Sequence, residues 1–125
     1  MTTLFYAALL GLMSLVLGSI PGSMRGRKGI PIGDGGDQAM LLAIRRHANF
    51  VEQVPLPLIL IFLLETNGVS NAAIHGLGAA LLITRIVHAV GLKAETMSNA
   101  GRIIGAAGTA LTTLVAAVWA LVVYF

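Results

Sequence analysis

The chain has 125 residues, of which 57% are hydrophobic and only 10% are charged, and its mean hydropathy is +0.90. Because about a quarter of the residues in a soluble domain are charged, this composition excludes an ordinary soluble domain and indicates a membrane protein. The net charge of +3 comes from basic residues at the edges of apolar runs, which argues against nucleic-acid binding, and the absence of cysteine excludes disulfides and a thiol nucleophile of the chain's own.

Four apolar runs follow one another along the chain, each long enough to cross a membrane as a helix. About 20 apolar residues are needed per crossing, so one domain covering residues 1–125 has room for four helices and short connections. These connections are too short to recross the bilayer, which makes neighbouring helices antiparallel. The sequence predicts an all-α, integral membrane four-helix bundle in up-down order, with helices at about 3–20, 38–64, 72–92 and 101–125.

The first predicted helix lacks the basic N-terminal region of a signal peptide, and its apolar run is longer than that of a signal peptide. It is expected to end at Pro21-Gly22, where a Gly-rich, basic loop begins. This loop contains the sequence IGDGGD, whose aspartates do not have the spacing of a calcium-binding loop, and we assign no metal site to the chain. Asp37, at the end of the loop, is expected to cap the second helix.

The second predicted helix carries most of the polar groups in its first half. Arg45, Asn49 and Glu52 stand at i, i+4 and i+7, so they line one stripe and can contact one ligand together. Arg46 and His47 point roughly 100° and 200° away from Arg45. We interpret these two side chains as headgroup anchors or as contacts with another subunit.

Proline residues interrupt the same helix just beyond its polar stripe. Pro55 and Pro57 remove two backbone donors, so we expect the helix to bend or loosen there.

The third and fourth predicted helices place further polar groups near the same membrane surface. Arg85 and His88 are at i and i+3, on one helix face. Arg102 begins the fourth helix, where the free N–H groups and the helix dipole attract anions. Headgroup anchoring is the alternative role for the arginines, because long basic side chains at helix ends commonly reach the lipid headgroups. His75 lies near the opposite surface, and we assign it no role.

The basic residues also predict how the chain is oriented. All eight lie in or near the first and third connections, whereas the termini and the second connection have none. Because basic loops face the cytoplasm, we expect both termini outside and any polar pocket open toward the cytoplasm.

This polar pattern resembles the signature of the MAPEG family, the membrane-associated proteins in eicosanoid and glutathione metabolism. The resemblance covers nearly the whole chain and points to a bacterial member that is similar to microsomal glutathione transferases. It implies a homotrimer in the bacterial inner membrane that binds glutathione between adjacent subunits. The matching residues are Arg45-x3-Asn49-x2-Glu52-x2-Pro55, Arg85-x2-His88 and Arg102.

The resemblance also implies an activity and a role for each matching residue. It implies a glutathione-dependent transferase or peroxidase, whose co-substrate attacks an apolar electrophile or a lipid hydroperoxide dissolved in the bilayer. Arg102 would be the catalytic residue that stabilises the glutathione thiolate. The residues that would bind glutathione are Arg45, Asn49, Glu52, Arg85 and His88.

Two other functions stay open at this point. The first is a non-catalytic member of the same family that binds a lipid or protein partner, since family enzymes acting on glutathione often have tyrosine at the positions of Gln53 and Leu92. The second is a small multidrug exporter. Such exporters resemble one another in a membrane-buried glutamate in the first helix, where this chain has Tyr6 as its only ionisable side chain, so this function ranks last.

Overall fold

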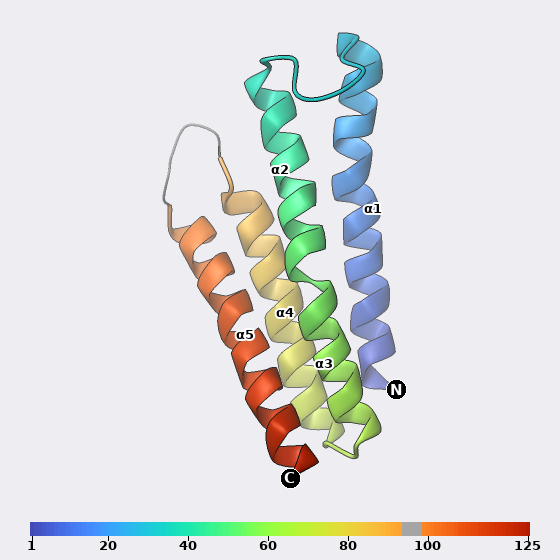
Figure 1. Ribbon diagram of the computed structural model, residues 1–125, viewed down its shortest axis with the longest axis vertical. Coiled ribbons are helices and arrows are strands. Elements are labelled where there is room, and N and C mark those ends of the chain that lie inside the picture. Colours follow the sequence, from blue (N-terminus) through green and yellow to red (C-terminus); the bar gives the residue numbers. More distant parts are fainter. Residues whose placement is uncertain (94–98) are drawn as a thin grey trace.

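The computed structural model describes residues 1–93 and 99–125, which form an all-helical bundle (Figure 1). Within these ranges, four spans are long and apolar enough to cross a membrane, because α2 and α3 together make one span. The predicted four-helix membrane fold is therefore confirmed. The helices are α1 (Thr2–Lys28), α2 (Gln38–Gln53), α3 (Pro55–Thr66), α4 (Asn71–Gly91) and α5 (Ala100–Tyr124).

The first helix is longer than the sequence predicts. α1 passes through Pro21, which is buried inside it, and ends only at Lys28. A proline is tolerated inside a membrane helix where the surroundings satisfy the freed backbone groups. The helix ends at Gly29, which has a φ of 65° and whose N–H donates to the carbonyl of Arg25. Glycine takes this left-handed conformation without steric cost, so Gly29 is the residue that stops the helix.

The expected interruption at the paired prolines is confirmed, since α2 and α3 are separated at Val54. Pro55 and Pro57 have no N–H groups and cannot donate to the carbonyls four residues earlier. The helical path continues through the interruption, because the Val54 N–H donates to Phe50 and the Leu58 N–H donates to Val54, each at 3.1 Å. The two short helices therefore act as one membrane span with a weakened centre.

Glycines let α4 and α5 pack with their backbones close together. A Cβ added at Gly91 would lie 2.5 Å from the backbone nitrogen of Arg102, and one added at Gly105 would lie 2.5 Å from the Cβ of His88. Such distances are far below van der Waals contact, so neither position accepts a side chain without movement. The small-residue face of the last helix therefore packs against α4 of the same chain.

Polar contacts tie the start of α1 to the neighbouring helices, at the end of the bundle where both termini lie (Figure 1). The Glu65 carboxylate of α3 accepts the backbone N–H groups of Thr2 and Thr3, the latter at 2.8 Å. The Tyr6 hydroxyl lies 3.0 Å from Nδ1 of His75 in α4. His75, which has no role in the sequence analysis, therefore helps to hold α1 in place.

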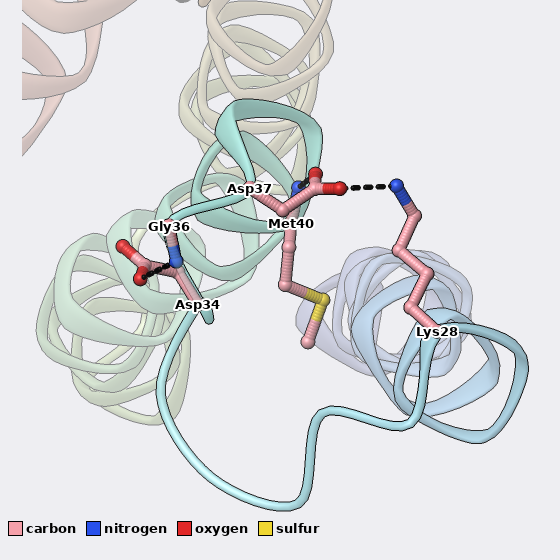
Figure 2. Close-up of polar contacts among 5 residues, drawn as sticks. All are labelled: Lys28, Asp34, Gly36, Asp37 and Met40. Atoms are coloured by element: carbon pink, nitrogen blue, oxygen red, sulfur yellow. Dashed lines mark hydrogen bonds and ion pairs between the residues drawn. The ribbon is translucent and has the colours of Figure 1, made fainter.

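The connection between α1 and α2 is held by its own polar contacts (Figure 2). Asp37 caps α2 as expected, because its carboxylate accepts the Met40 N–H at 2.8 Å, and it also pairs with the Lys28 ammonium. Asp34 accepts the N–H of Gly36 at 2.9 Å. The bond from Lys28 holds the pKa of Asp37 below its usual value, since a nearby cation favours the charged carboxylate. These contacts join the end of α1 to the start of α2.

Candidate functional site

A pocket of about 250 Å³ lies between the C-terminal end of α4, the N-terminal end of α5 and the side of α2. The α1–α2 pair extends beyond the ends of α4 and α5 at this end of the bundle (Figure 1), so one wall of the pocket is taller than the others. The residues that line it are Gln38, Leu41, Leu42, Arg45, Asn49, His88, Leu92, Lys93 and Arg102.

The polar stripe of α2 contributes two of its three predicted residues to the pocket lining. Arg45 and Asn49 both face it. Glu52 lies one turn deeper and is not among the lining residues, but its carboxylate is 3.9 Å from the Arg45 guanidinium. Both side chains of this pair are more than half exposed, at 54% and 55%. Glu52 is therefore joined to the site through Arg45.

Arg85 of α4 lies behind the pocket and supports it. Its side chain is only 2% exposed and donates from Nη1 to Oδ1 of Asn49 at 2.8 Å and from Nη2 to the carbonyl of Gly105 at 3.3 Å. Its Nε is buried without a hydrogen-bond partner among the described residues. The bond from Arg85 fixes the orientation of the Asn49 amide, because only the amide oxygen can accept it.

His88 stands one turn after Arg85 on the same face of α4, as the sequence predicts. It is 6% exposed and is one of the residues that line the pocket. The same turn of α4 packs against Gly105 of α5. The two predicted residues therefore have different places: His88 lines the pocket, whereas Arg85 lies behind the residues that line it.

Arg102 comes from the first turn of α5, which begins at Ala100 with Asn99 as its N-cap. The Asn99 side chain accepts the N–H of Arg102 at 2.9 Å and donates to the carbonyl of Gly91. Because this backbone N–H is already bound to the cap, the guanidinium is the group of Arg102 that can attract an anion. The four predicted residues that share the pocket lining are Arg45, Asn49, His88 and Arg102.

Two polar residues of α2 have contacts that the sequence analysis did not assign. Arg46 does not reach for headgroups, because its Nε and Nη2 donate to the carbonyl of Leu92 at 3.2 and 2.8 Å. His47 lies against α1, where a Cβ added at Gly18 would be 3.0 Å from its Nε2. Both partners are far away in the sequence, so helical periodicity gave the direction of these side chains but not what they meet.

Lys93 and Gln38 also line the pocket and were not predicted. Lys93 follows the end of α4, and Gln38 begins α2. The signal for Lys93 was its position directly after a predicted helix, at the surface that also holds the other basic residues.

The charge around the pocket is strongly positive. Arg45, Lys93 and Arg102 line it, and Arg85 lies directly behind it. The Glu52 carboxylate lies 3.9 Å from the Arg45 guanidinium and so brings one negative charge to this group of cations. The arrangement therefore favours an anionic ligand. The described residues contain no group of three or more histidine or acidic side chains that would hold a metal ion.

The fold and the site define a multi-pass membrane protein, a four-helix bundle with a cationic pocket at one end. The sequence profile of the MAPEG family matches residues 3–122, and the chain belongs to this family.

Two curated relatives support this membership, both described as inner membrane protein YecN. One is from Escherichia coli strain K12 and the other from Escherichia coli O6:H1. Each is 32% identical to this chain over 91 residues, which is 73% of this chain and 70% of the relative. No solved structure matches.

Proposed function

We propose that this protein is a membrane-bound, glutathione-dependent transferase or peroxidase, with glutathione bound in the pocket between α2, α4 and α5. The observation that carries the proposal is the excess of positive charge, with Arg45, Lys93 and Arg102 lining the pocket and Arg85 buried behind it. Glutathione has two carboxylates and one ammonium group, so it complements several cations and one carboxylate. Membership of a family with glutathione-dependent enzymes supports the same ligand.

The predicted binding residues have distinct tasks in this proposal. Arg45 and His88 bind the carboxylates and peptide groups of glutathione, and Asn49 binds an amide in an orientation that Arg85 fixes. Glu52 binds the ammonium group. Its contact with Arg45 is exposed and 3.9 Å long, and such surface pairs are weak, so the carboxylate can change partner at little cost.

Arg102 is the catalytic residue of the proposed reaction. Its guanidinium is a permanent cation, and a cation beside the sulfur lowers the thiol pKa by about 1 to 3 units. The thiol proton passes to solvent, and the thiolate is the nucleophile.

The thiolate then reacts with a partner from the bilayer. In the transferase reaction the sulfur forms a bond to carbon and the leaving group departs with its electron pair. In the peroxidase reaction the sulfur takes the terminal OH group of a hydroperoxide as the O–O bond breaks, and the departing alkoxide takes a proton from solvent to become an alcohol. A second glutathione then converts the resulting sulfenic acid to a disulfide and water.

The assembly and location follow from the same proposal. The pocket of one chain, about 250 Å³, is below the range of roughly 300 to 1,000 Å³ that is usual for small-molecule sites. A homotrimer in which a neighbouring subunit completes the site would supply the missing wall. The YecN relatives are described as inner membrane proteins, and the basic residues favour an inner-membrane orientation with the pocket toward the cytoplasm.

The first test is binding and turnover with the detergent-purified protein. Millimolar glutathione should raise its melting temperature, because a ligand that binds the folded state stabilises it. Conjugation of a chlorodinitrobenzene-type electrophile should be detectable by absorbance and should require glutathione. If glutathione neither shifts the melting temperature nor supports conjugation, the proposed function is wrong.

The role of Arg102 is tested by replacing its guanidinium. We expect Arg102→Ala to lower kcat near pH 7 by about eight- to thirty-fold, the loss of thiolate when a thiol pKa lowered by about 1 to 3 units returns to about 8.5, with a smaller change in the glutathione Kd. Arg27→Ala is the matched control, because it removes an exposed cation at the same end of the bundle but outside the pocket lining. An equal loss of binding and turnover would contradict a thiolate-stabilising role.

A second candidate is a non-catalytic member that binds a lipid or protein partner. It is favoured by the apolar part of the lining, because Leu41, Leu42 and Leu92 stand beside the cations and suit an anionic amphiphile. Glutathione binding without detectable conjugation or peroxide reduction would favour this candidate over the enzyme.

A further inference from the structure

We propose that Arg46 and Asn99 are positioning residues that hold the two sides of the pocket together. They bind adjacent carbonyls at the end of α4, those of Leu92 and Gly91, from two different helices. These four residues are called the clasp below. Its effect on catalysis rests on the proposed function, whereas its effect on the position of the helices does not.

One half of the clasp joins α2 to α4. Two N–H groups of the Arg46 guanidinium, on Nε and Nη2, donate to the Leu92 carbonyl at 3.2 and 2.8 Å. Leu92 is the C-cap of α4, and the last carbonyls of a helix have no donors within it. A cation at a helix C-terminus is also favoured by the helix dipole. Arg46 therefore satisfies a group that α4 leaves open, and it does so from another membrane span.

The other half of the clasp joins α4 to α5. Asn99 donates from Nδ2 to the Gly91 carbonyl and accepts the Arg102 N–H on Oδ1 at 2.9 Å. The backbones are also in close contact here, since a Cβ at Gly91 would lie 2.5 Å from the backbone nitrogen of Arg102. The end of α4 and the start of α5 therefore form one unit, which Arg46 attaches to α2.

The place of this attachment connects it to the pocket. Arg46 directly follows Arg45, and Leu92 and Lys93 belong to the lining together with Arg45. Arg46 is absent from that lining, so it acts through the residues that it holds. Its bonds set the separation between the α2 wall and the opposite wall, which carries Arg102. Without them, the bond from Arg85 to Asn49 still joins α4 to α2 about two turns deeper, but the distance between the Arg102 guanidinium and a thiolate bound against α2 is less tightly constrained.

The first measurement is hydrogen exchange, which does not depend on glutathione. We expect Arg46→Met to increase the amide exchange rates of residues 88–93 and 99–103 by about five- to tenfold, the usual size of a lost cap contact. Arg46→Lys should have a smaller effect, because an ammonium can donate to the carbonyl but lacks the two-pronged guanidinium. Arg27→Met is the matched control for the loss of one cation at this end and should leave both segments unchanged.

The second measurement is the pH profile of kcat for the wild-type protein and the same variants. In Arg46→Met, kcat should fall about tenfold, the glutathione KM should change less than threefold, and the pKa of the profile should rise toward that of the free thiol. Arg46→Lys should recover part of each change. A variant that merely contains less folded protein would lower kcat without moving the pH profile.

The outcomes separate the clasp from the proposed function. Unchanged exchange in both segments for Arg46→Met would overturn the clasp, and increased exchange with an unchanged pH profile would overturn its positioning role. If Arg46→Met does not fold, the same two measurements are made on Asn99→Ala and Arg46→Lys. The changes in exchange rate and in the pH profile should be less than additive in the double variant, because both residues bind the end of α4. If exchange responds as expected but the wild-type protein does not bind glutathione, the clasp stands and the proposed function falls.

Discussion

At the scale of single residues, glycines decide how closely the two halves of the bundle approach. Gly105 of α5 is the clearest case, because a Cβ there would meet the backbone and Cβ of His88 at 2.5 to 2.6 Å. His88 is part of the pocket lining, so a side chain at position 105 would push directly on the site. Packing and function therefore depend on the same contact.

We expect Gly105→Ala to reduce the stability of the protein by about 1 to 3 kcal/mol, the usual cost of overpacking. Gly76→Ala is the matched control, since Gly76 lies in α4 with nothing within 4 Å of an added Cβ. Alanine is the better helix former by up to about 1 kcal/mol, so the control should be neutral or stabilising. Thermal unfolding in one detergent measures both variants, and equal melting temperatures would contradict the close packing at position 105.

The sequence predicted which face of a helix a site residue lies on, but not which residues of other helices it contacts. Helical periodicity correctly put Arg45 and Asn49 on one face, because both lie within a single regular helix. It could not place Arg85 behind Asn49, since that contact depends on how α4 packs against α2. The contact of Arg46 with Leu92 was missed for the same reason, because it joins two helices whose relative height the sequence does not give.

At the scale of the helices, prolines had two different effects. Pro21 lies inside α1 and does not stop it, whereas Pro55 and Pro57 separate α2 from α3. A single proline removes one bond of the helix ladder, but two prolines with one residue between them remove two bonds within one turn. The same residue type therefore gave a correct prediction in one helix and a wrong helix end in the other.

The start of α1 depends on a residue from another helix. Its N-cap position, Met1, makes no side-chain cap, and the Glu65 carboxylate of α3 binds the N–H groups of Thr2 and Thr3 instead. A carboxylate at this place also has a favourable interaction with the positive end of the helix dipole. Glu65 therefore acts as a cap that is supplied by tertiary structure.

We expect Glu65→Ala to increase amide exchange in the first turn of α1 and to cost about 0.5 to 2 kcal/mol, the usual range for a lost N-cap. Glu65→Gln keeps an acceptor oxygen without the charge and should fall between the wild type and Glu65→Ala. The neighbouring Thr66→Ala serves as the control, because the Thr66 hydroxyl donates to the carbonyl of Leu63 in its own helix. Unaltered exchange at the start of α1 in Glu65→Ala would show that α1 does not need this cap.

At the scale of the whole molecule, the absence of cysteine makes the orientation directly measurable. A single introduced cysteine is the only thiol that a membrane-impermeant reagent can label. Ile32, which is 85% exposed in the first connection, and Ser70, which is exposed in the turn before α4, lie at opposite ends of the bundle. These two positions therefore distinguish the two possible orientations.

We expect Ser70→Cys to be labelled in intact cells and Ile32→Cys to be labelled only after the membrane is permeabilised. The physical reason is the basic character of the connection that contains Ile32, because loops rich in arginine and lysine stay in the cytoplasm. The cysteine-free wild type is the background control. The reverse labelling pattern would place the pocket outside and would contradict a site supplied with cytoplasmic glutathione.

The unequal lengths of the helices determine how deep the pocket lies. At 1.5 Å per residue, the 21 residues of α4 are about 31 Å long, close to the roughly 30 Å of hydrocarbon in a bilayer, whereas the 27 residues of α1 reach about 40 Å. We therefore expect the pocket at the end of α4 to lie at the boundary between acyl chains and headgroups. Amphiphilic molecules accumulate in that layer. The reaction rate of an apolar reactant there should therefore depend on the mole fraction of the reactant in the lipid. Adding inert lipid should lower that rate even when the total volume is constant.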